Sequence, residues 1–165
     1  MKLRPYIPGR DFSVIKNWIG DERTHAMWCA GHFRYPLEQE NFEGVLTKIT
    51  LERGETPLIA VMDDGREAGF FCYSINNETK EGMLKFVVVN PEFRGKGEAG
   101  EMLKLASQYA FEITGADAVH LNVFPENIRA KKCYQKAGFI ERNVVENAFS
   151  YKEESWGRCN MIYRK

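Results

Sequence analysis

The stretch that decides the fold runs Met83-Leu-Lys-Phe-Val-Val-Val-Asn-Pro-Glu-Phe-Arg94-Gly-Lys-Gly-Glu-Ala-Gly100-Glu-Met-Leu103. It predicts a strand, a short connector, a glycine-rich loop and the first turn of a helix. Glycine leaves room for an anion, and a helix N-terminus adds unsatisfied N–H donors and partial positive charge. Arg94 and Lys96 add formal positive charge. The stretch therefore predicts a cradle for a phosphate or pyrophosphate group.

Two common phosphate motifs fit this stretch poorly. Gly95-Lys-Gly97-Glu-Ala-Gly100 has the spacing of a dinucleotide fingerprint, but residues 90–94 separate it from the strand. The acidic residue that should end the next strand is missing, because Asp117 precedes that strand. The Walker pattern requires lysine where Glu101 stands. A small NAD-binding module is therefore only a minor alternative.

A better match begins at the arginine. Arg94-x-x-Gly97-x-Ala99, between an apolar strand and an amphipathic helix, resembles the acetyl-CoA pyrophosphate loop of the GNAT superfamily of N-acetyltransferases. A second segment resembles that family's other signature: Asn127-Ile-Arg-Ala-Lys-Lys-Cys-Tyr134-Gln-Lys-Ala-Gly138-Phe139. The resemblance in order and spacing covers roughly residues 55–165.

The resemblance implies a mixed α/β fold in one N-acetyltransferase domain over residues 1–165. Its central sheet would be mostly antiparallel, with six to seven strands, splayed central strands and helices on both faces. The splaying strands would be residues 83–89 and 118–124. From their own patterns, residues 11–19 and 37–52 predict helices and residues 25–36 an irregular, aromatic-rich loop. Strands are expected at 139–145 and 156–163 near the end of the chain.

Acetyl-CoA is the cosubstrate that the resemblance implies. Free backbone groups at a bulge near Val87, Val88 and Val89 would hold the pantetheine arm and stabilise the oxyanion of the reaction. Glu98 departs from the family pattern, which usually has an apolar residue there. The remaining cofactor-binding residues implied by the match are Arg94, Gly95, Lys96, Gly97, Glu98, Ala99 and Asn127.

Tyr134 matches the family's proposed general acid, which meets the departing thiolate. A phenol near pKa 10 protonates a thiolate near pKa 8.5 uphill by roughly 2 kcal/mol. Tyr134 should therefore act chiefly by hydrogen bonding to the developing charge on sulfur. The competing interpretation is a core tyrosine on an amphipathic helix.

No residue stands out as a general base. A lysine-like amine costs roughly 4.6 kcal/mol to neutralise at pH 7, whereas an α-amine costs only about 1–1.4 kcal/mol. A base is therefore important for the first kind of acceptor and optional for the second. The candidates that the sequence leaves open are Glu81, Glu126, His120, Asp21 and Glu22.

Residues 25–35 form a cluster rich in histidine and aromatic residues. His25, Cys29 and His32 are too few for a metal site without a second cluster, so no metal is expected. Contact with the acceptor is the favoured role, and ordinary loop packing is the alternative. Trp28, Phe33 and Tyr35 would favour an acceptor with an apolar or cationic part. A basic patch either faces solvent or approaches the ribose phosphate of CoA, and it comprises Arg129, Lys131, Lys132 and Lys136.

Composition narrows the partners. The chain has 44% hydrophobic residues and equal numbers of Lys+Arg and Asp+Glu, 23 each, so nothing favours nucleic acid or an anionic membrane as a partner. Four scattered cysteines and the absence of an apolar leader or span favour a cytoplasmic protein with reduced thiols. Cys133 has no evident histidine partner, which argues against an acyl-cysteine intermediate.

The sequence thus predicts direct acetyl transfer to a primary amine of a small molecule or of a peptide or protein N-terminus. The alternative is a non-catalytic CoA-binding sensor of the same fold. The resemblance also raises a homodimer as an expectation.

Overall fold

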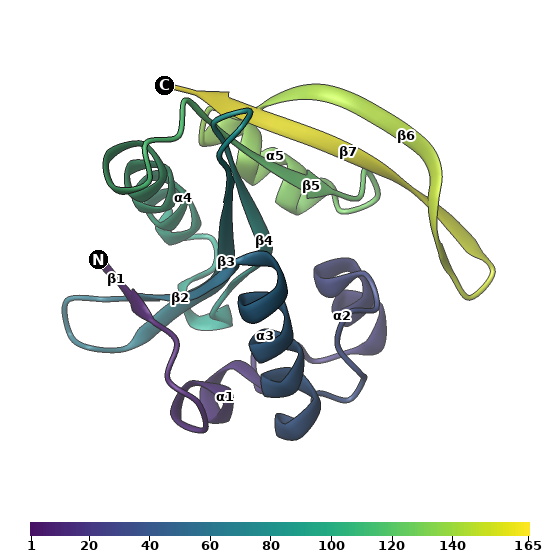
Figure 1. Ribbon diagram of the computed structural model, residues 1–165. Helices are drawn as coiled ribbons and strands as arrows, with labels where there is room; N and C mark the ends of the chain where they lie inside the picture. The colour runs from purple at the N-terminus through teal and green to yellow at the C-terminus, as the bar shows by residue number, and fades with distance from the viewer.

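A seven-stranded sheet crosses the whole molecule in the order β1-β2-β3-β4-β5-β7-β6 (Figure 1). The computed structural model describes all residues 1–165. Only the central β4–β5 pair is parallel. The predicted mixed, mostly antiparallel sheet is confirmed. The strands are β1 (Lys2–Pro5), β2 (Thr56–Val61), β3 (Glu67–Asn76), β4 (Glu81–Val89), β5 (Ala118–Val123), β6 (Ile140–Tyr151) and β7 (Glu154–Arg164).

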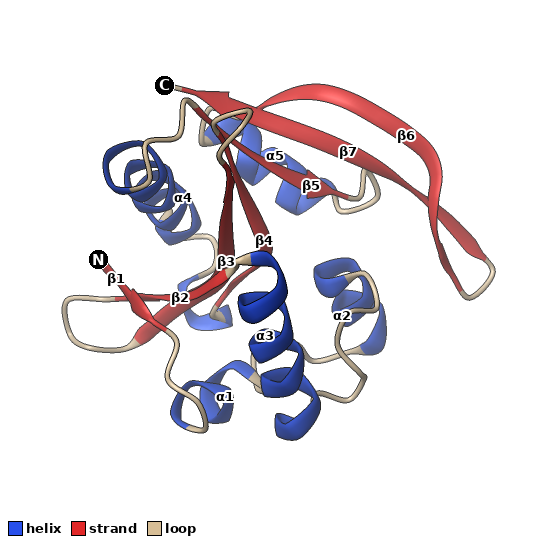
Figure 2. Ribbon diagram, in the orientation of Figure 1, coloured by secondary structure: helices blue, strands red, loops and turns tan.

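Helices cover both faces of the sheet, as predicted (Figure 2). One face carries α1 (Arg10–Ile15), α2 (Glu22–Cys29) and α3 (Gln39–Arg53). The other carries α4 (Glu98–Gln108), which continues as a π-helical turn over Tyr109–Ile113, and α5 (Ile128–Lys136). Each face buries its own hydrophobic core, so the sheet separates two layers of packing.

The expected irregular loop over residues 25–36 is wrong in its first part, because α2 occupies Glu22–Cys29. Asp21 caps this helix, its Oδ1 accepting a hydrogen bond of 2.8 Å from the Thr24 backbone N–H. His25, Ala26 and Cys29 face the interior. The helix is short and its buried face includes a histidine, so its apolar periodicity is weak in the sequence.

Other boundaries also differ from the sequence expectation. Helix α1 ends at Ile15 rather than near residue 19. The closing strands β6 and β7 are longer than expected and make a hairpin that extends beyond the rest of the sheet on the side of α2 (Figure 1). Arg23 of α2 binds Glu154 of the hairpin at 2.9 Å and lies 5.2 Å over the ring of Trp156. Contacts distant in sequence therefore determine how far these strands extend.

The two central strands separate as predicted. Strands β4 and β5 pair over four positions, from Glu81 with Ala118 to Leu84 with Leu121. Beyond these positions β4 continues to Val89 without pairing to β5. The register between β3 and β4 shifts there by one extra residue in β4, and Phe86 has a φ of 53°. The bulge therefore lies at Phe86, one residue before the expected Val87.

None of the helices combines the length and the apolar character that a membrane span requires.

Candidate active site

A cavity of about 1090 Å³ passes between the separated strands and is lined from both faces of the sheet. Residues of α2, α3 and β4 line one side, and the loop before α4 together with α5 lines the other. Nine of the predicted site residues line this cavity: Val87, Val88, Val89, Arg94, Gly95, Gly97, Ala99, Asn127 and Tyr134. Lys96 and Glu98 are not among the residues that line it.

The loop before α4 presents a row of unused backbone donors. Gly97 stands at the N-cap with a φ of 94°, a conformation that favours glycine. The backbone N–H groups of residues 95–99 donate to no acceptor in the protein, since the first turn of a helix has no carbonyl one turn back. Five consecutive free donors at the start of an 11-residue helix suit a diphosphate group.

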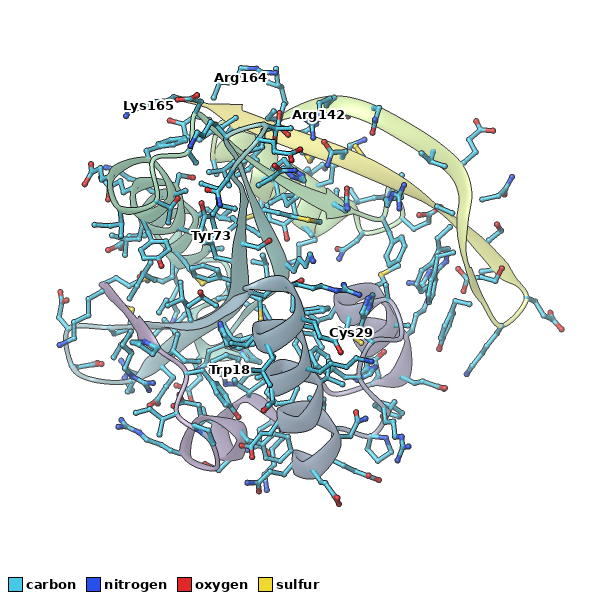
Figure 3. The ribbon with its side chains drawn as sticks, viewed as in Figure 1. Trp18, Cys29, Tyr73, Arg142, Arg164 and Lys165 are labelled. Atoms are coloured by element: carbon cyan, nitrogen blue, oxygen red, sulfur yellow. The ribbon has the colours of Figure 1, made fainter.

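The guanidinium of Arg94 was expected to offer positive charge to a phosphate, but in the structure it forms two hydrogen bonds to backbone carbonyl groups. Its Nε donates to the Val89 carbonyl oxygen at 2.9 Å and its Nη2 to that of Trp18 at 2.8 Å. Burial and the nearby Arg129 lower the pKa of Arg94. Arg94 thus ties the end of β4 to the segment after α1, where Trp18 lies (Figure 3). It braces the loop more than it offers charge to a ligand.

The basic patch is divided by the structure. Arg129, Lys132 and Lys136 line the cavity, whereas Lys131 pairs with Glu141 at 2.8 Å outside it. Three of the four cations therefore line the same cavity as the glycine loop. The side chain of Glu98 keeps one carboxylate oxygen buried without a hydrogen-bond partner.

Helix α2 is fastened to the bulge of β4. The indole Nε1 of Trp28 donates a hydrogen bond of 2.8 Å to the Phe86 carbonyl oxygen. Sequence reasoning singled out Trp28 for acceptor contact but missed Phe86, because a bulge leaves no clear residue signature. Phe33, also expected near the acceptor, is buried in the core, and Tyr35 packs on His25 without lining the cavity.

Tyr134 reaches the cavity from α5. Only 8% of the residue is exposed, and burial raises its pKa well above the ordinary value. No protein group forms a hydrogen bond with its hydroxyl, so the hydroxyl is free to donate to a ligand. Asn127 caps α5, since its Oδ1 accepts from the Ala130 N–H at 3.2 Å. Its amide nitrogen has no partner in the protein.

The candidate bases lie outside the cavity. Glu81 accepts a hydrogen bond of 2.8 Å from Arg142, which lowers the pKa of its carboxyl group. Burial lowers the pKa of His120. Asp21 caps α2, Glu22 pairs with Lys152 at 2.8 Å, and Glu126 accepts from the Gly157 N–H at 3.3 Å. The one carboxylate that lines the cavity is Glu55, which sequence reasoning did not select.

Two cysteines near the cavity are poor nucleophiles. Burial raises the pKa of the Cys29 thiol, which lies 3.6 Å from Nδ1 of His25. Burial likewise raises the pKa of the Cys133 thiol. A protonated thiol does not attack a thioester readily. This supports transfer without an acyl-cysteine intermediate.

Comparison with known proteins agrees with this geometry. The model of the acetyltransferase (GNAT) family matches residues 15–139. Aminoglycoside N(6′)-acetyltransferase type 1 of Klebsiella pneumoniae is 23% identical over 147 residues, or 82% of this chain and 72% of that protein. Spermidine N(1)-acetyltransferase of Escherichia coli (strain K12) is 34% identical over 88 residues, or 52% of this chain and 47% of that protein.

The fold also matches a crystal structure of spermidine N-acetyltransferase from Vibrio cholerae in complex with CoA and spermine. The TM-score is 0.82 at 22% identity, and the match covers 99% of this chain and 94% of the other. The chain belongs to the acetyltransferase (GNAT) family. It is an N-acetyltransferase that uses acetyl-CoA as its cosubstrate, as the sequence predicted.

Proposed function

We propose that this protein transfers the acetyl group of acetyl-CoA directly to the primary amine of a small molecule. The observation that carries the proposal is the cavity between β4 and β5, which joins the free amides of residues 95–99 to the α2 side of the sheet. The diphosphate of CoA would bind those amides, with Asn127 and the cations of α5 beside it. The pantetheine arm would then lie along Val87–Val89.

The acetyl carbonyl would meet the bulge of β4. Because the Phe86 carbonyl points to Trp28, the N–H of the same trans peptide, at Val87, points the opposite way. That N–H is the proposed donor to the oxyanion formed when the amine attacks the thioester. As the carbon–sulfur bond breaks, the free hydroxyl of Tyr134 would donate a hydrogen bond to the thiolate. Its raised pKa disfavours full proton transfer in the absence of ligand.

The relatives support a small-molecule acceptor. Their names give an aminoglycoside and spermidine as the molecules on which they act. A peptide or protein N-terminus is the other acceptor that the sequence raised.

The test is release of free CoA thiol from acetyl-CoA in the presence of single amines, including spermidine, an aminoglycoside with a 6′-amine, amino acids and short peptides. Amine-dependent thiol release above the rate without amine is expected. Acetyl-CoA binding without thiol release for every amine would instead identify the non-catalytic sensor.

A homodimer through β6 is part of the proposal. This strand lies at the edge of the sheet, and three of its apolar side chains are exposed: Ile140, Val144 and Val145. Sedimentation of the wild-type protein and of Val144→Lys tests the dimer, since the charged variant should be monomeric.

The reducing cytoplasm is the proposed location of the protein, because its four cysteines are unpaired.

A further inference from the structure

The cavity has an unusual balance of charge. Its lining includes one carboxylate, Glu55, and seven cationic side chains: Arg53, Lys85, Arg94, Arg129, Lys132, Lys136 and Arg158. Four of these, from the glycine loop and α5, lie where the phosphates of CoA are proposed to bind. The other three belong to α3, β4 and β7, away from that end.

Strand alternation places Lys85 and Arg158 on the face opposite the cofactor loop. Leu84, Leu121 and Met161 pair across β4, β5 and β7, and all three lie in the core beneath α4 and α5. Side chains one residue from Leu84, or three from Met161, point to the other face. Lys85 and Arg158 therefore share the face of α2 and α3, where Arg53 ends α3.

Only one of the two carboxylate oxygens of Glu55 is bonded to another group of the protein. Glu55 is 1% exposed and pairs with Lys85, while its Oε2 has no hydrogen-bond partner. Arg53 and Arg158 form no ion pair within the protein. The acceptor side thus holds three cations against one anion, together with a buried oxygen that lacks a donor.

We infer that the acceptor is an amine that also carries an anionic group, in its simplest form an amino acid. The anionic group would bind Arg53 and Arg158 near the mouth of the cavity, and an N–H of the amine would donate to Oε2 of Glu55. A guanidinium matches carboxylate geometry with two parallel donors. A polyamine brings several positive charges to a surface that is already cationic, so this chain should differ in acceptor from its spermidine-acetylating relatives. The inference rests on the proposed acetyl transfer.

Matched acceptors that differ only by the anionic group test this inference. Thiol release would be measured for phenylalanine and phenethylamine, arginine and agmatine, and O-phosphoethanolamine and ethanolamine, with spermidine alongside. The anionic member of a pair is expected to have a kcat/KM at least tenfold higher, and the carboxylate and phosphate pairs separate the two sources of charge. Equal rates within the pairs, or preference for spermidine, would overturn the inference while leaving acetyl transfer intact. Absence of thiol release with every amine would reject both.

A double variant links the preference to the named residues. Arg53→Gln with Arg158→Gln should raise KM for the anionic acceptor about tenfold and leave KM for its uncharged counterpart and for acetyl-CoA unchanged. The matched control is Lys48→Gln with Arg164→Gln, on the same helix and strand but outside the cavity, and it should behave as wild type. Figure 3 shows Arg164 at the end of the sheet far from Cys29. An equal effect of the two double variants would contradict the assignment.

Glu55→Gln tests the amine side. The amide keeps the size of the side chain and can still accept from Lys85, but it loses the charge that attracts an ammonium. KM for the acceptor should rise about tenfold with KM for acetyl-CoA unchanged. If a variant with the melting temperature of wild type kept the same KM for the acceptor, Glu55 would not bind the acceptor amine and would serve only as the ion-pair partner of Lys85.

Discussion

The indole of Trp28 holds the Phe86 carbonyl at 2.8 Å, so a side chain of α2 fixes a peptide in the bulge of β4. This bond joins α2, on the acceptor side, to the strand along which the cofactor is proposed to lie. It sets the direction of the Val87 N–H, because the two polar groups of one trans peptide point in opposite directions. The bond is therefore a positioning device for the proposed oxyanion donor.

Trp28→Phe should lower kcat. The ring still packs on Phe33, but the bond to the Phe86 carbonyl is lost, so the Val87 N–H is held less firmly. A tenfold loss, about 1.4 kcal/mol of transition-state stabilisation, is expected with little change in KM for acetyl-CoA. Steady-state kinetics check this. A normal kcat in the folded variant would show that the bulge needs no such support.

Gly97→Ala should weaken acetyl-CoA binding. An added Cβ at Gly97 meets no atom within 4 Å, so the effect comes from the left-handed φ of 94°, a strain of about 1–2 kcal/mol. Relief of that strain would turn the amides of residues 95–99 away from one another. Calorimetry should give an affinity about tenfold lower. Gly65→Ala is the control, since its φ of 90° carries the same strain in a hairpin outside the cavity. Gly65→Ala should lose stability and keep its affinity for acetyl-CoA. Equal affinities for acetyl-CoA in the two variants would argue against a role of the glycine loop in cofactor binding.

Tyr134→Phe should separate turnover from binding. The Tyr134 hydroxyl has no protein partner, so its removal should leave the melting temperature unchanged while kcat falls by about tenfold to a hundredfold. Tyr73→Phe is the matched control, because the Tyr73 hydroxyl bonds to Thr114 at 2.6 Å away from the cavity. It should lower the melting temperature and keep kcat. An unchanged kcat for Tyr134→Phe would assign Tyr134 to the core alone.

Stability should fall as the solution becomes more acidic. Burial lowers the pKa of His25 from an ordinary value of 6.5, so the unfolded chain gains a proton that the folded chain excludes. The stabilisation is present above about pH 6.5 and is lost as the pH falls toward the folded-state pKa. Melting temperatures should therefore drop between about pH 7 and pH 5.5, and less steeply in His25→Gln. His120 has the same direction of shift, so the double variant should be flatter still. A slope that both variants share with wild type would contradict the prediction.

Much of the site could be predicted from the sequence because its chemistry is local. The glycine loop, the following helix and Tyr134 lie in two short segments whose residue types dictate a turn, a helix N-terminus and an amphipathic face. Strands 83–89 and 118–124 were likewise predicted from their own apolar patterns, whereas their separation was implied only by the family resemblance. These features need no knowledge of distant contacts.

The tertiary structure alone decided the rest. Helix α2 gains its burial from the hairpin and the sheet, and the bulge at Phe86 appears only when β4 is set against β3. Glu55 and Lys85 are 30 residues apart in the sequence, where each resembles an ordinary surface charge. They form an ion pair only because the folded sheet places Lys85 of β4 beside Glu55. Sequence patterns report which face of an element is buried, whereas the meeting of two faces depends on how the strands pair, and that is a property of the whole chain.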